Sequence, residues 1–250
     1  MQNSKREKLV YTDIGENGIR IPFWVIIAVT CCLILFFGVY TASATPSSER
    51  VFENNFESVV EVKAETGDRV RSFGSAVLVK KDGLFVTNAH VVTYNESSRT
   101  VEFEAYYIRF AFESDYRSVE LIKYNTDLDV AVIRLKEMPS FGLKSVSVGH
   151  TEGLKAGVVV YAVGNAMNYG LSITQGIVGI PSVEIEYADQ KRRVIQCDLT
   201  IADGNSGGAL LDARGKWIGI TTFRTKDSKG VVIYGLAYCI PVEIVLEYVG

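Results

Sequence analysis

The stretch Gly204-Asn205-Ser206-Gly207-Gly208 lies between two apolar segments, and Thr87-Asn88-Ala89-His90 precedes it far upstream. Glycines on both sides of Ser206 allow the backbone to adopt positive φ and to approach a substrate closely. The amides of Gly204 and Ser206 can then point together at a developing oxyanion. The stretch is therefore typical of a nucleophilic serine on a tight turn, although a flexible surface turn has the same composition.

Size and charge restrict the classes of function. The chain has 250 residues, 48% of them hydrophobic, which is enough to bury a substantial core. Its formal net charge is −3, so it has no basic field that would attract nucleic acid. We interpret its one compact basic run, Lys191-Arg192-Arg193, as a solvated hairpin tip. We expect no nucleic-acid partner.

The cysteines and histidines do not have the spacing of a metal site. Cys31-Cys32 lies inside an apolar run, whereas Cys197 and Cys239 belong to separate strand-like segments. Neither His90 nor His150 has a second ligand beside it in the sequence. We expect no metal and no cofactor, and we interpret His150 as a surface or loop residue.

An uncharged segment near the N-terminus predicts a membrane-spanning helix. No charged residue occurs between Arg20 and Glu49, and residues 23–40 are almost continuously apolar, close to the roughly 20 residues that span a bilayer. Positive charges precede this segment, which places residues 1–20 in the cytosol and everything after residue 44 outside it. We expect residues 21–44 to be the signal-anchor helix of a single-pass membrane protein with an extracytoplasmic globular part. Two alternatives stay open, namely secretion after cleavage near Ala44 and a buried core helix.

Beyond a short polar linker at residues 45–51, the chain breaks into brief β-rich runs separated by turn residues. Typical runs are 59–62, 76–79, 84–86, 101–104, 130–133 and 158–161. Such short strands predict an antiparallel all-β fold. A loop at 137–142 separates two halves of similar length, and two small β-barrels are expected because closure removes exposed strand edges. We place barrel 1 at about 52–138 and barrel 2 at about 143–240, followed by a short helix from Pro241 onward.

A serine hydroxyl becomes a nucleophile when an imidazole takes its proton and a carboxylate fixes the tautomer of that imidazole. Only two histidines are available, and His90 is the better candidate because it ends a strand at a place where its side chain can face a cleft. Ser206 lies in the other half of the chain. A cleft between two such halves is a common ligand site.

Five blocks of the sequence, in this order, resemble the HtrA/DegP-type, trypsin-fold serine proteases. They are residues 74–92, 127–133, 162–165 with 174–178, 196–211 and 235–242. The resemblance covers roughly residues 52–249. It implies a trypsin-like protease domain at residues 52–250 that consists of two antiparallel six-stranded barrels. It also implies a serine endopeptidase that cleaves polypeptides, among them unfolded or damaged proteins, and a homo-trimer by analogy. Because the sequence ends at Gly250, we expect no C-terminal PDZ domain of the kind that many of these proteases carry.

The resemblance assigns roles to three residues. His90 becomes the general base, Asp129 the carboxylate that orients it, and Ser206 the nucleophile. Asp127 is the rival acid, and Asp129 is favoured because it directly precedes Val-Ala-Val-Ile, as the aspartate of the family does.

The resemblance also implies an oxyanion hole and a substrate pocket. Amides of Gly204, Asn205 and Ser206 surround the oxyanion. In trypsin-like folds the residues just before the serine and the strand after it form the walls of the pocket for the substrate's P1 side chain. Here these walls are residues 199–202 and 219–223, and the pocket residues that we expect are Thr200, Ile201, Ala202, Ile220, Thr221 and Thr222. We expect small or medium aliphatic P1 residues, because Thr200 stands where an Arg- or Lys-selective pocket carries an acid and Ile201 narrows an apolar pocket.

Three questions stay open at this point. Asp203 brings a negative charge next to the oxyanion turn, so a catalytically silent binding or sensor module is one alternative. A glutamyl-specific protease is another, although the sequence shows no cation beside Ser206 for it. Cys197 and Cys239 either form a disulfide or remain two buried thiols.

Overall fold

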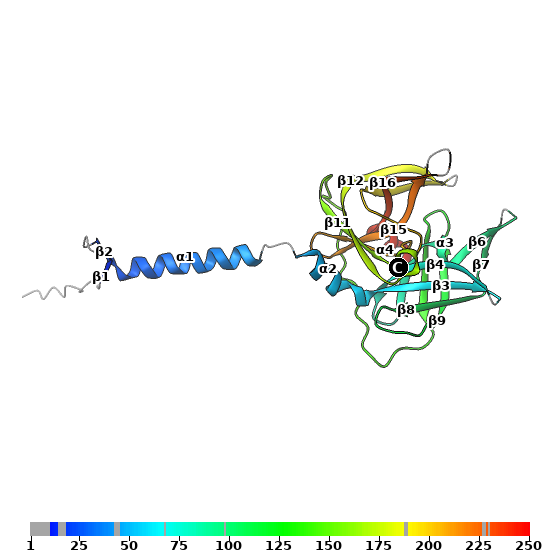
Figure 1. The fold of residues 1–250 in the computed structure, drawn as a ribbon, viewed down its shortest axis with the longest axis horizontal. Helices are drawn as coiled ribbons and strands as arrows, with labels where there is room; N and C mark the ends of the chain where they lie inside the picture. The colour runs from blue at the N-terminus through cyan, green and yellow to red at the C-terminus, as the bar shows by residue number, and fades with distance from the viewer. Residues whose placement is uncertain are drawn as a thin grey trace, which may run out of the picture. The chain divides into compact units, whose positions relative to one another are not determined.

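The computed structural model describes residues 11–14, 19–42, 46–67, 69–97, 99–187, 190–226, 229 and 231–250. The chain divides into two compact units, Met1–Thr45 and Pro46–Gly250. In the first unit, β1 (Tyr11–Ile14) pairs antiparallel with β2 (Ile19–Pro22), and α1 spans Phe23–Ala42 (Figure 1). Counted over the described residues, no helix is both long enough and apolar enough to cross a membrane. The rest of the predicted cytosolic segment 1–20 lies outside the described residues.

Two closed six-stranded barrels make up the second unit, which confirms the predicted all-β architecture (Figure 1). The first barrel has the order β10-β5-β4-β3-β8-β9, with bounds β3 (Val59–Thr66), β4 (Arg69–Lys80), β5 (Leu84–Thr87), β8 (Ala105–Phe110), β9 (Arg117–Asn125) and β10 (Val130–Leu135). The second has the order β11-β12-β13-β16-β15-β14, with bounds β11 (Val159–Gly164), β12 (Ser172–Tyr187), β13 (Gln190–Cys197), β14 (Ala209–Asp212), β15 (Trp217–Lys226) and β16 (Val232–Pro241). Neighbouring strands within each barrel are antiparallel.

Side chains of alternating polarity explain why these segments form barrel strands. In β8, Tyr106, Ile108 and Phe110 are buried, while the residues between them are half-buried. Successive side chains of a strand point to opposite faces, so this period of two fills the barrel interior from one face. The same pattern lets each barrel close around its own apolar core.

A third apolar cluster joins the two barrels. It contains Val77 and Val132 from the first barrel and Val163, Leu211 and Ile220 from the second. Each buried Val, Leu or Ile side chain contributes about 1.5–3 kcal/mol relative to an exposed one. An interface of this kind holds the barrels in a fixed relation, which a site built from both of them requires.

Short helices flank the barrels. They are α2 (Ser48–Asn55), η1 (Phe56–Ser58), α3 (Ala89–Val92), η2 (Ala166–Asn168) and the predicted terminal helix α4 (Val242–Val249). A small hairpin of β6 (Thr93–Glu96) and β7 (Arg99–Glu102) follows α3. The prediction of a linker at 45–51 is wrong from residue 48 onward, because α2 begins there. Ser47 caps this helix by accepting a hydrogen bond from the Arg50 amide at 3.3 Å, and Val51 is buried in the interface between the barrels.

The second barrel contains two cysteines on neighbouring strands, Cys197 on β13 and Cys239 on β16. Both are free and buried. A hydrogen bond with Cys197, together with burial, raises the pKa of the Cys239 thiol. Of the two alternatives left open by the sequence, the structure has the pair of buried thiols.

Candidate active site

His90 lies on α3, which begins directly after β5 of the first barrel. Ala89, Val91 and Val92 are buried around it, and this fixes the helix on the barrel. The side chain of His90 itself is 49% exposed. The short helix therefore presents the imidazole to the cleft while its neighbours anchor the backbone.

Asp129 precedes β10 and has its backbone in the left-handed region, with φ of 55°. Its buried carboxylate accepts hydrogen bonds from the His90 amide at 3.1 Å and from His90 Nδ1 at 3.0 and 2.9 Å. Thr222 Oγ1, from β15 of the other barrel, donates to Oδ2 at 2.6 Å. A carboxylate accepts only, so Nδ1 carries the proton and Nε2 remains a base. Asp129 thus contacts the histidine as the sequence analysis expects.

The charge of Asp129 is stabilised in spite of its burial. Burial alone would raise its pKa, but the electrostatic attraction to the His90 imidazole and the hydrogen bonds from His90 and Thr222 outweigh that effect. The pKa of Asp129 therefore lies below its usual value. The carboxylate stays ionised at neutral pH, as it must to stabilise an imidazolium.

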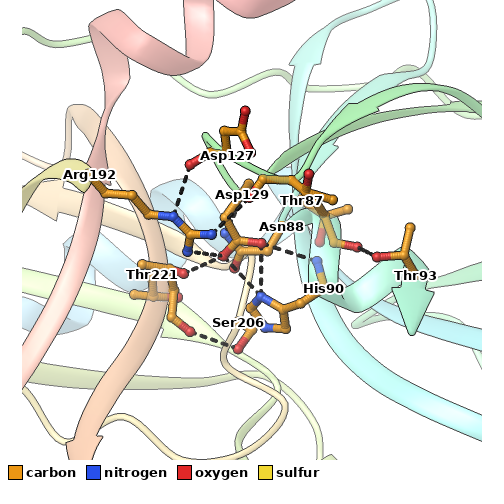
Figure 2. Close-up of polar contacts among 12 residues, drawn as sticks. Thr87, Asn88, His90, Thr93, Asp127, Asp129, Arg192, Ser206 and Thr221 are labelled. Atoms are coloured by element: carbon orange, nitrogen blue, oxygen red, sulfur yellow. Dashed lines mark hydrogen bonds and ion pairs between the residues drawn. The ribbon is translucent and has the colours of Figure 1, made fainter. Parts of the chain in front are cut away.

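Ser206 lies in the turn before β14 and lines one cleft together with His90 and Asp129. Figure 2 shows the three side chains gathered where the two barrels meet. The Ser206 hydroxyl donates to the Thr222 carbonyl at 3.0 Å. It must therefore rotate away from Thr222 before it can give its proton to His90. Catalytic hydrogen bonds of this kind often form only once substrate is bound.

The turn that carries Ser206 leaves two amides available. Among the described residues, the amides of Gly204 and Ser206 donate to no protein acceptor, whereas the Asn205 amide donates to the Ala202 carbonyl at 3.1 Å. Gly204 has φ of +91°, and a Cβ there would lie 2.2 Å from the Asn165 carbonyl oxygen. Two free amides around a glycine match the donors of an oxyanion hole. Asn205, which was predicted as a third oxyanion donor, does not serve as one because its amide is already hydrogen-bonded to the Ala202 carbonyl.

The cleft has a volume of about 700 Å³. Ile201, Ala202 and Thr222 line it as predicted, but Thr200, Ile220 and Thr221 do not. Ile220 packs into the core between the barrels, and Thr221 is buried with its hydroxyl bonded to the Asn205 carbonyl. The strand after Ser206 instead places Phe223, the last residue of the predicted wall segment, and Arg224 in the cleft, and Arg224 was not predicted.

The prediction that the basic run 191–193 is a solvated hairpin tip is wrong for its middle residue, Arg192. Its side chain is only 10% exposed, and Nη1 lies 3.9 Å from Oδ2 of Asp129. It donates from Nε to the Asp127 carbonyl at 2.9 Å and from Nη2 to the Thr126 carbonyl at 2.8 Å (Figure 2). Its strand neighbours Lys191 and Arg193 are exposed. Because successive side chains of a strand point to opposite faces, β13 turns Arg192 inward while Lys191 and Arg193 face solvent. The same alternation, applied to the sequence, would have predicted this inward position.

Asp203, whose negative charge suggested a silent site, has a partner. Arg224 Nη2 donates to Asp203 Oδ1 at 2.8 Å. The Asp203 side chain is 85% exposed, so water and Arg224 both screen its charge from the Gly204 amide. The charge of Asp203 is therefore a weak reason to interpret the domain as a non-catalytic module.

Comparisons with known proteins agree on one type of domain. A family model described as a trypsin-like peptidase domain matches residues 74–220. Serine endoprotease DegS of Haemophilus influenzae is 30% identical over 202 residues, which are 80% of this chain and 56% of that protein. Putative serine protease HhoB of Synechocystis sp. is 32% identical over 178 residues, or 70% of this chain and 39% of that protein. The chain thus spans about half the length of these curated relatives, or less.

A solved structure shares the fold as well. HtrA-type protease AlgW with tripeptide aligns with a TM-score of 0.69 at 27% identity, and the alignment covers 81% of this chain and 62% of that one. The similarity therefore includes the three-dimensional arrangement as well as the sequence blocks.

Proposed function

Because the chain belongs to the trypsin-like peptidase family, we propose that it is a serine endopeptidase that cleaves polypeptides through an acyl-enzyme on Ser206. One observation carries the proposal. Asp129 holds the Nδ1 side of His90 inside the cleft that Ser206 also lines. That arrangement leaves Nε2 as the base for the nucleophile.

In this mechanism the Ser206 hydroxyl rotates to His90, loses its proton to Nε2 and attacks the scissile carbonyl. The amides of Gly204 and Ser206 stabilise the oxyanion that forms, and the ionised Asp129 stabilises the imidazolium. His90 then protonates the leaving amine. A water molecule activated by His90 hydrolyses the acyl-enzyme and restores Ser206.

Covalent labelling with a fluorophosphonate tests the assignment. We expect the intact chain to be labelled, and Ser206→Ala and His90→Ala not to be. Ser140→Ala and His150→Ala are matched controls, since both residues are exposed and neither lines the cleft. Equal labelling of Ser206→Ala and the intact chain would refute the assignment.

We further propose that residues 21–44 anchor the enzyme in a membrane and that the second unit faces away from the cytosol. Two features support this proposal. The segment 23–40 is almost continuously apolar in sequence, and large apolar side chains of α1, among them Trp24, Leu33 and Leu35, are exposed. A helix with apolar residues all round is stabilised by lipid.

Membrane extraction separates this proposal from its alternative. Active protein should stay in the membrane pellet after alkaline carbonate washing, and external protease should reach the second unit in intact cells. Recovery of a soluble form that begins just after Ala44 would instead indicate a cleaved signal peptide. The trimer implied by the resemblance stays a prediction for light scattering in detergent.

We propose unfolded or damaged proteins as substrates. An open cleft between two barrels accepts an extended backbone, and unfolded segments supply one without prior opening. Cleavage of a reduced, unfolded protein at a rate well above that of its native form is the expected result, and equal rates would contradict it.

A further inference from the structure

Arg224 lies on β15 and lines the cleft. Its guanidinium bonds to the segment just before Ser206. Nη1 donates to the Ile201 carbonyl at 3.0 Å, and Nη2 donates to Asp203 Oδ1 at 2.8 Å. All three residues line the cleft together with Ser206.

The two partners of Arg224 differ in how firmly they hold it. The Ile201 carbonyl belongs to a buried residue, so this bond fixes the position of the guanidinium. Asp203 is 85% exposed, and ion pairs with such exposed groups contribute little to stability. Only two of the five N–H groups of a guanidinium are used in these bonds. Arg224 is thus a positioned cation whose anionic partner can be exchanged.

The second cation of the cleft does not offer the same possibility. Arg192 is bonded to the carbonyls of Thr126 and Asp127 and lies close to Asp129. Its donors are committed to the loop that carries the triad carboxylate. Of the two arginines among the described residues that line the cleft, Arg224 is therefore the one placed to bind an anionic ligand.

We propose that Arg224 binds the carboxylate of an acidic side chain on the P1 residue, the substrate residue directly before the scissile bond. The acyl carbon of this residue becomes bonded to Ser206, so its side chain lies against the residues that flank Ser206 in the cleft, Ile201 and Arg224. The substrate carboxylate replaces Asp203 as the partner of Nη2. This inference rests on the proposed endopeptidase function. It replaces the expectation of an aliphatic P1 residue, because Arg224 supplies the cation that a glutamyl-selective pocket needs and that the sequence did not reveal.

Matched peptides that differ only in Glu or Gln at P1 test the proposal, because Gln has the same shape without the charge. A hydrogen bond to a charged group predicts kcat/KM about tenfold to hundredfold higher for Glu than for Gln. Arg224→Gln should reduce this ratio to about one, because the Glu peptide then loses its charged partner in the cleft. Asp203→Asn should raise the ratio, because the competing carboxylate is gone.

Two further variants serve as controls. Arg224→Lys retains the charge without the bidentate geometry and should retain part of the preference. Arg214→Gln removes an exposed arginine between β14 and β15 that does not line the cleft, and its ratio should match that of the intact chain. Equal cleavage of the Glu and Gln peptides by the intact chain would overturn the proposal. So would a preference that survives in Arg224→Gln.

Binding to Ser206→Ala separates this inference from the proposed function. The affinity of this variant for the two uncleaved peptides, measured by fluorescence anisotropy, needs no turnover. A Glu preference there, together with absent fluorophosphonate labelling of the intact chain, would leave Arg224 as the acid-binding residue and refute the peptidase assignment. Normal labelling with equal affinities would refute the role of Arg224 alone.

Discussion

Replacing Ser75 by alanine should damage catalysis without touching the triad. Ser75 lies on β4 of the first barrel and is fully buried. Its hydroxyl donates to the Gly204 carbonyl at 2.8 Å and accepts from the Asn165 amide at 2.8 Å. Its own amide donates to the Ser206 carbonyl at 2.8 Å. One side chain of the first barrel therefore holds the oxyanion turn of the second.

The size of the effect follows from these two side-chain bonds. Ser75→Ala leaves the Gly204 carbonyl and the Asn165 amide buried without this partner, at about 1–3 kcal/mol each. We expect the free energy of unfolding to fall by about 2–4 kcal/mol. The peptide between Gly204 and Asn205 also loses its anchor, which loosens the turn between the two oxyanion amides. Loss of one such donor costs about 10²–10³ in kcat, so a partial misalignment predicts a decrease of about 10- to 100-fold.

Urea unfolding and steady-state kinetics with a peptide substrate measure the two effects separately. KM should change little, because Ser75 does not line the cleft. Ser72→Ala, a half-exposed serine on the same strand, should match the intact chain in both assays. An unchanged kcat per folded molecule in Ser75→Ala would refute the reasoning.

Three further predictions concern the same domain. Thr222→Val removes the donor to Asp129, so the pKa of this aspartate should rise and kcat should fall about tenfold, as a pH profile of kcat would show. Gly204→Ala places a Cβ 2.2 Å from a backbone oxygen at φ of +91°, and single-turnover kinetics should show acylation slowed about 100-fold or more. Burial tends to raise the pKa of Glu243, but hydrogen bonds from the Thr151 amide and hydroxyl outweigh it and lower this pKa from its usual 4.5. The ionised Glu243 therefore stabilises the fold above pH 4.5 and loses this effect as the pH falls through the lowered pKa, so Glu243→Gln should cost about 1 kcal/mol at pH 7 and less in acid, by urea unfolding.

The barrels and the meeting of His90, Asp129 and Ser206 could be predicted because their signals are local. Short alternating strands, a glycine turn and a histidine at a strand end each occupy a few consecutive residues. The ordered blocks then placed the three side chains in two halves that share a cleft. Asp129 was preferred over Asp127 on such a local signal, its position directly before β10.

The supporting contacts could not be predicted, because they depend on how distant segments dock. Ser75 reaches Gly204 over 129 positions and Arg192 reaches Asp127 over 65. No periodicity within one segment encodes such a pair. The predicted lining of the cleft was partly wrong for a related reason. The pairing of β15 with β16 is irregular between Thr221 and Phe223, and this irregularity decides which side chains of β15 face the cleft.

The order of the two barrels along the chain also matters during synthesis. His90 and Asp129 leave the ribosome with the first barrel, whereas Thr222, the donor to Asp129, follows 93 residues later. Synthesis adds about 5–20 residues per second. For roughly 5–20 seconds a nascent chain therefore contains His90 and Asp129 but not yet Thr222, which donates to Asp129 in the folded domain. The serine arrives only near the end of this interval. Under the proposed mechanism, a growing chain is therefore unable to cut itself or its neighbours until nearly the whole domain has been made.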